Sequence, residues 1–243
     1  MAAPPYDDPP AYRQEANDPD EIVQPAVLIL DGQFIYSESI RSSPLYELSR
    51  VIHAQSATTT EIDFQRLEYR SKTLADGSPS IAKRERQLYK LQRVPFFNQV
   101  RHESECYMKA LSNKGIGTVG FKKAPFPHSG LRAARILSES QKKDSNLKRR
   151  FIFALKENGS VFEWTDSNGR LVATQTRDDT GRHMLLVALP LSRRLLDSLV
   201  ALWCVWLWQL HLDYLGEGQG KKWEWNNGKL ISVASHPSPS FMN

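Results

Sequence analysis

Short apolar segments separated by turn residues recur along much of the chain, which is the pattern of β-strands. The pattern is clearest in residues 150–189, where four short apolar segments recur at intervals of roughly ten residues. Two of the intervening turns contain Asn158-Gly159 and Asn168-Gly169, dipeptides that favour tight β-hairpin turns. This region therefore predicts an antiparallel meander of four strands.

Similar segments precede the meander. Residues 26–30 and 33–36 flank Asp31-Gly32, a hairpin signal, and residues 62–69 alternate with period two. Further strands are expected at residues 44–48, 88–91 and 105–108, and Asp76-Gly77 is expected to form a turn.

The period changes after Pro190. Ser192 is a candidate helix N-cap, and residues 193–212 contain no Gly or Pro and are apolar on nearly every side. Such a helix is buried all round or lies in a membrane. Its uninterrupted apolar run, residues 199–208, is shorter than the roughly 20 residues that a span requires, so no transmembrane span is expected. A sheet closed around the helix would bury it and remove exposed strand edges. The expected fold class is mainly β: a closed antiparallel β-barrel around a buried hydrophobic C-terminal α-helix at about residues 192–212.

Composition divides the chain into two parts of opposite charge. The 243 residues carry a net charge of +5, but residues 1–25 carry −5 and six of the 14 prolines. This Pro-rich acidic segment has little to bury and is expected to be a disordered tail. The rest of the chain carries +10, which favours acidic partners such as membrane surfaces or nucleic acid.

The two cysteines, Cys106 and Cys204, both lie in apolar surroundings and are far apart in sequence. A disulfide framework is therefore not expected, which fits a reducing compartment. The first residues lack the basic and apolar regions of a secretory signal. We expect a cytoplasmic protein, and peripheral attachment to a membrane and a nuclear location both stay open.

Four segments resemble a group of uncharacterised fungal proteins: residues 45–48, 64–70, 162–166 and 196–203. That group is similar to the Tubby C-terminal-like superfamily, which includes LURP-one-related proteins and phospholipid scramblases. The resemblance covers residues 26–212 and implies a closed antiparallel barrel of about twelve strands threaded by a C-terminal helix. It also implies a phospholipid-binding function. In the simplest version of this fold the helix comes last, so residues 213–243, with a Gly-rich linker and an expected hairpin at 221–233, depart from it.

The acidic tail contains Pro9-Pro10-Ala11-Tyr12, which matches the Pro-Pro-x-Tyr ligand of WW domains. Consecutive prolines pre-form a polyproline II helix, so little entropy is lost when an aromatic groove binds them. Pro9, Pro10 and Tyr12 are therefore candidate contacts to a WW-domain ubiquitin ligase of the HECT type. The alternative is a chance match in a Pro-rich tail.

The basic residues of the body form three clusters, which are candidates for an anionic-lipid patch: Lys83, Arg84 and Arg86; Lys122 and Lys123; and Lys142, Lys143, Lys148, Arg149 and Arg150. Each basic residue near an anionic membrane contributes about 1 kcal/mol to binding. The alternative is a coat of solvated charges that keeps the barrel soluble. Nucleic-acid binding ranks below lipid because no recognition helix or RNA-binding signature occurs.

Motifs that would indicate an enzyme are scarce. Gly115-Ile116-Gly117-Thr118-Val119-Gly120 spells GxGxxG, but Pro125 and Pro127 exclude the helix that a dinucleotide site requires, so these glycines are expected in a strand or bend. The six histidines do not pair at metal-ligand spacing, and no CxxC occurs. We therefore expect a non-enzymatic protein with no catalytic residues, no metal and no cofactor. The leading expectation is a peripheral phospholipid-binding module, the alternative is an adaptor for a WW-domain ligase, and nucleic-acid binding is the remote alternative.

Overall fold

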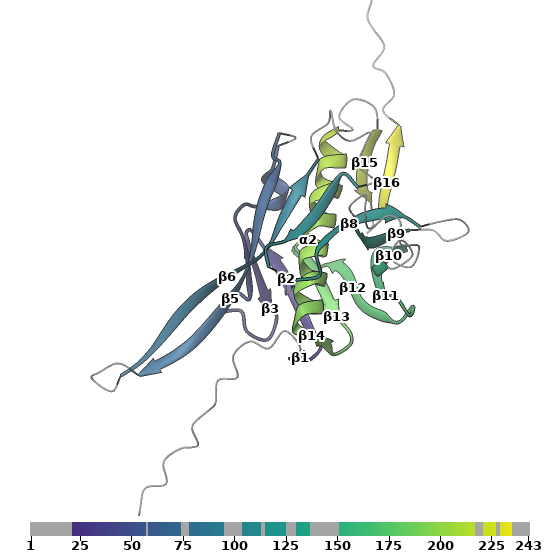
Figure 1. Ribbon diagram of the computed structural model, residues 1–243. Helices are drawn as coiled ribbons and strands as arrows, with labels where there is room; N and C mark the ends of the chain where they lie inside the picture. Colours follow the sequence, from purple (N-terminus) through teal and green to yellow (C-terminus); the bar gives the residue numbers. More distant parts are fainter. Residues whose placement is uncertain are drawn as a thin grey trace, which may run out of the picture.

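A computed structural model describes residues 21–56, 58–73, 78–94, 104–112, 115–124, 130–136, 151–216, 221–226 and 229–234. In these residues twelve strands form a closed antiparallel barrel, in the order β10-β11-β12-β13-β2-β3-β4-β5-β6-β7-β8-β9. One α-helix, α2 (Arg193–Gly216), runs through the barrel (Figure 1). The predicted fold class is confirmed.

Twelve strands make up the barrel: β2 (Ala26–Asp31), β3 (Phe34–Ser37), β4 (Tyr46–Leu48), β5 (Glu61–Thr73), β6 (Pro79–Arg93), β7 (Cys106–Ala110), β8 (Thr118–Lys123), β9 (Leu131–Arg135), β10 (Phe151–Asn158), β11 (Val161–Asp166), β12 (Leu171–Arg177) and β13 (His183–Val187). A short 3₁₀-helix, η1 (Ile52–Ala54), follows β4. Outside the barrel, β1 (Ile22–Val23) pairs with β14 (Leu191–Ser192), and β15 (Lys221–Asn226) pairs with β16 (Lys229–Ala234).

The meander predicted at residues 150–189 is present as β10 to β13. Its turns have the local chemistry that the sequence suggests, since Gly159 and Gly169 adopt positive φ angles of 65° and 78°. In the second turn the carboxylate of Asp166 accepts hydrogen bonds from the backbone N–H groups of Asn168 and Arg170, at 2.9 and 3.0 Å. Asp side chains stabilise turns in this way, so the strand boundaries are fixed locally.

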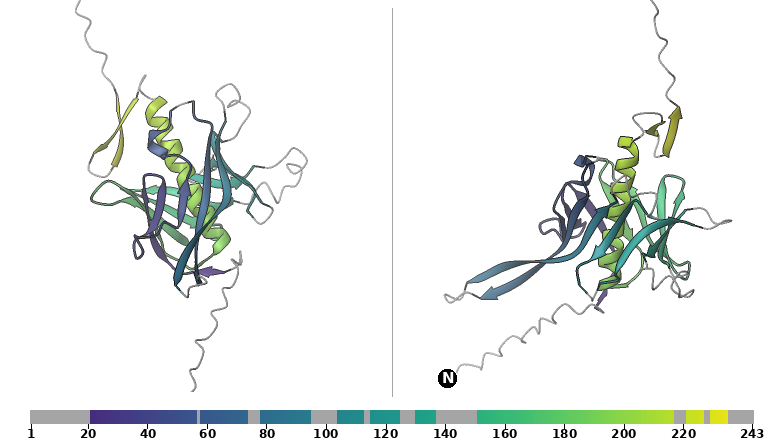
Figure 2. Two further views of the ribbon diagram at one scale, coloured as in Figure 1. Left: turned by 90° about the vertical axis from the view of Figure 1, so that its left-hand side faces the viewer. Right: turned by 45° about the horizontal axis from the view of Figure 1, so that its top comes forward.

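The barrel encloses the middle of α2 completely. Eight consecutive residues, 198–205, are 0% exposed, and eight residues make more than two full turns, so every side of the helix is covered. The Oγ atom of Ser192 accepts a hydrogen bond from the N–H of Leu195 at 3.4 Å, in the predicted N-cap position. By length and composition α2 could cross a membrane, but 78% of its apolar window is buried inside the protein. Figure 2 shows the helix among the surrounding strands in two further views.

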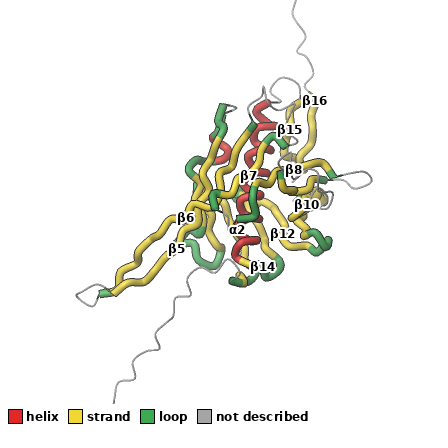
Figure 3. The backbone as a smooth tube through the Cα atoms, in the orientation of Figure 1, coloured by secondary structure: helices red, strands yellow, loops and turns green. Residues whose placement is uncertain are grey.

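Strands β5 and β6 are much longer than predicted and leave the barrel together. β4 last pairs with β5 at Arg66, and β7 first pairs with β6 at Tyr89. Beyond these points β5 and β6 pair with each other as far as Thr73 and Pro79, and backbone hydrogen bonds join only their first residues, Leu67 and Leu88, to Leu45 and Leu111. We call residues 67–73 and 79–88 the ribbon. It projects to the lower left in Figure 1 as a continuous pair of strands, coloured yellow in Figure 3.

Alternate connections of a closed antiparallel barrel leave it at the same end, because neighbouring strands run in opposite directions. One end, which we call the ribbon end, carries the ribbon, the β1–β14 pair, the start of α2, and the β3–β4, β7–β8 and β11–β12 connections. The opposite end carries η1 and the last turns of α2, where the ring of His211 lies 3.0 Å from the carbonyl oxygen of Gln55.

The GxGxxG segment leads into strand β8 and not into a helix. Gly120 lies inside β8, where an added Cβ would come within 2.6 Å of the Ser104 hydroxyl oxygen. That hydroxyl accepts a hydrogen bond from the N–H of Phe121 at 3.0 Å, which requires this close approach. Close packing within the barrel therefore accounts for the glycine.

Candidate functional site

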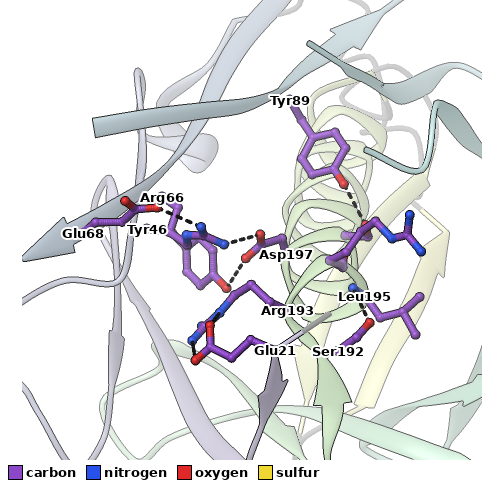
Figure 4. A network of polar contacts seen from close by, with 11 residues as sticks. Glu21, Tyr46, Arg66, Glu68, Tyr89, Ser192, Arg193, Leu195 and Asp197 are labelled. Atoms are coloured by element: carbon purple, nitrogen blue, oxygen red, sulfur yellow. Dashed lines mark hydrogen bonds and ion pairs between the residues drawn. The ribbon is translucent and has the colours of Figure 1, made fainter. Parts of the chain in front are cut away.

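A buried polar cluster lies where α2 enters the barrel (Figure 4). One oxygen of the Asp197 carboxylate accepts a hydrogen bond from the hydroxyl of Tyr46 at 2.9 Å. The other oxygen pairs with the Arg66 guanidinium at 2.7 Å. The three residues are 5%, 1% and 6% exposed, respectively. Tyr46 and Arg66 are cross-strand neighbours on β4 and β5, so the cluster joins two strands to the helix.

Burial and close contacts shift the pKa values of this cluster, and the contacts indicate a structural role. Burial raises the pKa of the Asp197 carboxyl, and the opposing influence of Arg66 and Tyr46 comes second. Burial, together with the Asp197 carboxylate, raises the pKa of the Tyr46 hydroxyl well above its usual range. A carboxylate near the start of a helix, such as that of Asp197, commonly interacts with the helix dipole. Both of its oxygens are instead occupied by Tyr46 and Arg66, so the carboxylate fastens the helix to the barrel wall.

Further contacts tie the start of α2 to its surroundings. The hydroxyls of Tyr89 and Ser198 lie 2.7 Å apart, and Ser198 donates to the Arg194 carbonyl oxygen at 2.6 Å. Arg193 forms an ion pair with Glu21 at 3.0 Å. The first turns of the helix are thereby held to β6 and to the segment that leads into β1.

The side of β5 that faces the barrel interior continues past the barrel as a face of the ribbon. Ile62 and Phe64 lie in the core, Arg66 reaches Asp197, and Glu68 and Arg70 follow at the same period of two. The strand register places Arg86 opposite Arg66, and Arg84 opposite Glu68. We call this surface, made by Arg66, Glu68, Arg70, Arg84 and Arg86, the arginine face.

Most of the charge on the arginine face is not neutralised. Arg66 spans Asp197 and Glu68, at 2.7 and 2.8 Å. Burial raises the pKa of the Glu68 carboxyl, but Arg66, followed by Arg86 and Arg84, outweighs it and lowers the pKa. In the part of the chain that the structure describes, no ion pair is formed by Arg70, Arg84, Arg86 or the nearby Arg194.

The carboxylates of the ribbon end are largely matched by their own cations. Five of them form ion pairs with four cations of this end, because Arg66 pairs with two carboxylates: Glu21, Glu68, Glu85, Asp166 and Asp197. The arginines without ion pairs are therefore a local excess of positive charge, carried by guanidinium groups that can bind phosphate oxygens in a bidentate manner.

The predicted basic clusters do not converge on one patch. Lys83 lies on the other face of the ribbon from Arg84 and Arg86, where it pairs with Glu47 at 3.3 Å and Glu85 at 3.0 Å. Lys122 and Lys123 end strand β8, which runs parallel to β6, so they lie at the end of the barrel opposite the ribbon. The third cluster, with Lys142, Lys143, Lys148, Arg149 and Arg150, lies outside the described residues, as do Pro9, Pro10 and Tyr12.

Exposed apolar side chains gather at the ribbon end as well. Ile81 lies on the face of the ribbon that carries Lys83, opposite the arginine face, and is 75% exposed, more than any other large apolar residue that the structure describes. Four others lie in β1, in the connections that follow β3 and β7, and at the start of β12: Ile22, Ile40, Leu111 and Leu171. Exposed apolar groups that accompany one sign of charge are typical of an interaction surface.

Reactive groups are inert or dispersed in the described part of the chain. It contains no group of three or more His, Cys, Asp and Glu side chains that could hold a metal ion. Burial raises the pKa of both thiols, Cys106 and Cys204, so neither is a nucleophilic thiolate.

No family model, no curated protein and no solved structure matches the chain. The excess arginines and the exposed aliphatic side chains of the ribbon end are therefore the features that a functional proposal has to explain.

Sequence reasoning missed Arg66, Arg70 and Arg194, although one signal for the first two was available. Residues 62–70 alternate with period two, and the core positions Ile62 and Phe64 are followed on the same face by Arg66, Glu68 and Arg70. A strand whose inward positions turn from apolar to charged is a strand that leaves the core. No comparable signal marks Arg194, because it follows Arg193 directly and nothing in the sequence pattern distinguishes the two residues.

Proposed function

We propose that this protein is a non-enzymatic peripheral membrane module that binds anionic phospholipid surfaces through the ribbon end of its barrel. The observation that carries the proposal is the coincidence, at one end of the molecule, of arginines without ion pairs and exposed aliphatic side chains. Peripheral membrane proteins combine these two features because cations attract the lipid headgroups and apolar groups enter the interface between headgroups and acyl chains.

The expected contributions to the free energy of membrane binding suit reversible attachment. Each arginine at an anionic surface contributes about 1 kcal/mol, so three or four give about 3–4 kcal/mol. Burying a large aliphatic side chain such as Ile81 adds about 1.5–3 kcal/mol where burial is complete. Neither contribution is sufficient alone, and together they support binding that salt weakens. The resemblance to phospholipid scramblase-like barrels is in keeping with a lipid partner.

The burial of α2 supports attachment at the surface over insertion. Its central residues fill the barrel, and its start is fastened through the Asp197 cluster. Moving this helix into a bilayer would empty the core and break a buried ion pair.

Neutralising the arginine face is expected to weaken membrane binding strongly. The variant Arg70→Gln/Arg84→Gln/Arg86→Gln should bind phosphatidylcholine vesicles that contain phosphatidylserine about 100-fold more weakly, since about 3 kcal/mol is lost. Flotation or sedimentation of the vesicles with the full chain measures this partition. Raising the salt concentration should reduce wild-type binding more than that of the variant.

A matched control removes the same number of charges from the opposite end of the barrel. The control variant is Arg50→Gln/Lys123→Gln/Lys156→Gln. All three residues are exposed: Arg50 follows β4, Lys123 ends β8, and Lys156 lies near the end of β10. This variant should bind vesicles nearly as well as the wild type. Equal loss in both variants would mean that the charge acts as a diffuse coat, and the ribbon end would then have no special role.

The Pro-Pro-x-Tyr motif supports a second proposed function, that of an adaptor for a WW-domain ubiquitin ligase of the HECT type. Pro9, Pro10 and Tyr12 precede β1 in sequence, and the barrel would then supply the location while the motif recruits the partner.

Replacing Tyr12 should abolish recruitment, because its ring is the specificity contact of the motif. We expect Tyr12→Ala to remove binding to isolated WW domains of HECT-type ligases, measured by pulldown or calorimetry, while vesicle binding is retained. Tyr6→Ala is a suitable control, since Pro4-Pro5-Tyr6 lacks the spacer residue. Unchanged WW binding by Tyr12→Ala would rule out the adaptor role of this motif.

A further inference from the structure

The chain enters the barrel at the ribbon end, directly beside the cationic groups. Strand β1 pairs with β14, so that Ile22 lies opposite Ser192 and Val23 opposite Leu191. The backbone N–H of Arg193 donates to the Glu21 carbonyl oxygen at 2.7 Å, and the two side chains form an ion pair. The segment that precedes Glu21 is therefore tethered at the end of the molecule that carries the arginine face.

That segment has the charge that the arginine face lacks. Residues 1–20 contain five carboxylates, Asp7, Asp8, Glu15, Asp18 and Asp20, against one arginine, a net charge of −4. Glu21, the first residue that the structure describes, already pairs with an arginine of this end. The same pairing is open to its acidic neighbours, because Arg70, Arg84 and Arg86 form no ion pair among the described residues.

The segment is also long enough to cover the face. An extended chain spans at most about 3.5 Å per residue, so the ~13 residues from Asp20 to Asp7 reach about 45 Å. The ribbon strand at residues 67–73 is only about 20–25 Å long, at 3.3–3.4 Å per residue. A tether of this kind holds its ligand at an effective concentration in the millimolar range, enough to populate contacts that are individually weak.

We propose that the acidic segment at residues 7–20 docks on the arginine face and competes there with anionic lipid. The segment thus occupies the surface that anionic lipid would otherwise bind. This inference rests on the proposed membrane function and adds how the same site is regulated. Several screened ion pairs hold the segment, so a surface that presents many negative charges displaces it, and salt releases it.

The position of the WW ligand inside the same segment couples the two proposed functions. A WW domain that binds Pro9, Pro10 and Tyr12 draws the segment off the arginine face and leaves the face open to lipid. Linkage requires the converse, so a membrane that displaces the segment makes the motif easier to bind. Membrane attachment and ligase recruitment should therefore strengthen each other.

Paramagnetic relaxation tests the docking without a membrane or a WW domain. A nitroxide attached to the full-length variant Ala16→Cys is selective, because Cys106 and Cys204 are both buried. At low salt we expect the label to broaden the backbone amide resonances of Arg70, Arg84 and Arg86. The broadening should disappear in about 0.5 M salt, where the Debye length falls to about 4 Å. It should also disappear when Asp7→Asn/Asp8→Asn/Asp18→Asn is added.

A charge-matched control keeps the comparison specific. Asp31→Asn/Glu157→Gln/Asp179→Asn removes three carboxylates at or beside turns of the opposite end, and should leave the broadening intact. In vesicle flotation the segment variant should bind several-fold more tightly than this control, although both change the net charge by the same amount. Adding a WW domain should abolish the broadening and raise vesicle binding by the wild type.

The outcomes separate this inference from the membrane proposal. Absence of broadening at the ribbon, or broadening that survives removal of the segment's carboxylates, overturns the docking whatever the vesicles do. Broadening at the ribbon without any vesicle binding keeps the docking and removes the membrane function.

Discussion

Replacing Arg66 by methionine is expected to lower the free energy of unfolding by about 3–5 kcal/mol, as removal of one partner of a buried ion pair typically does. Arg66 is the cation that neutralises Asp197, and both side chains are about 7% exposed. The substitution leaves the carboxylate in the barrel with only the Tyr46 hydroxyl as a partner, so its desolvation is no longer compensated. Urea unfolding followed by tryptophan fluorescence measures the change.

Removing the whole cluster should restore most of the lost stability. In Tyr46→Phe/Arg66→Met/Glu68→Gln/Asp197→Leu the Arg66 cation is removed together with both carboxylates that it pairs with. Buried ion pairs replaced by uncharged groups are often neutral in their effect. Arg84→Met, on the exposed part of the same ribbon face, should change the free energy of unfolding by less than about 0.5 kcal/mol. If Arg66→Met cost as little as Arg84→Met, the Asp197 carboxylate would have to be hydrated in the folded protein.

Truncating Trp203 to alanine is the second change with a large expected effect, again about 3–5 kcal/mol of lost stability. The indole is 0% exposed and belongs to the stretch of α2 that the barrel surrounds on all sides. A barrel closed around a helix cannot collapse far into the cavity that remains, since each strand is held by two neighbours. Chemical unfolding in aqueous buffer, without detergent or lipid, is the appropriate measurement.

Tyr214 on the same helix provides the control. It is an aromatic residue of the last turn and is 57% exposed, so Tyr214→Ala should alter stability by less than about 0.5 kcal/mol. Similar small effects at Trp203 and Tyr214 would contradict the enclosure of the helix, because a helix outside the barrel would give neither position a packed environment.

Sequence patterns predicted the parts of this fold in which an element packs against a core. The helix was expected at residues 192–212 and spans Arg193–Gly216, because apolar residues on all its sides require burial. The meander was predictable because its turns carry Asn-Gly dipeptides and its strands are short apolar segments at roughly ten-residue spacing. The resemblance implied about twelve strands, and the barrel has twelve.

The ribbon could not be predicted in the same way. Residues 79–87 of β6 include Lys83, Arg84, Glu85, Arg86 and Gln87, with no apolar period, because a two-stranded ribbon outside the barrel has no core to face. Strand β9 was missed because it contains Ala133 and Ala134 where larger apolar residues would mark a strand, whereas the glycine of β8 was expected in a strand or bend.

In the candidate site, too, some features follow from a local sequence pattern and others do not. That Lys83 and Arg84 point to opposite faces follows from the period of two once the strand is known. That Arg66 meets Asp197, 131 positions away, depends on the closure of the whole barrel, and no local pattern encodes it.

The closure of the barrel also dictates when this protein can fold during its synthesis. Strand β2 completes the ring by pairing with β13, where Val27 lies opposite Leu186, and the core of that ring is a helix that follows β13 in the chain. An emerging chain can form the hairpins β2–β3 and β5–β6, but its interior positions have nothing to pack against until α2 has left the ribosome. The core therefore forms only after α2 has emerged, and folding is dominated by contacts distant in sequence, which is the class of topology that folds slowly. The nascent apolar strands are exposed during that interval, so production of this protein should depend on chaperones that shield them.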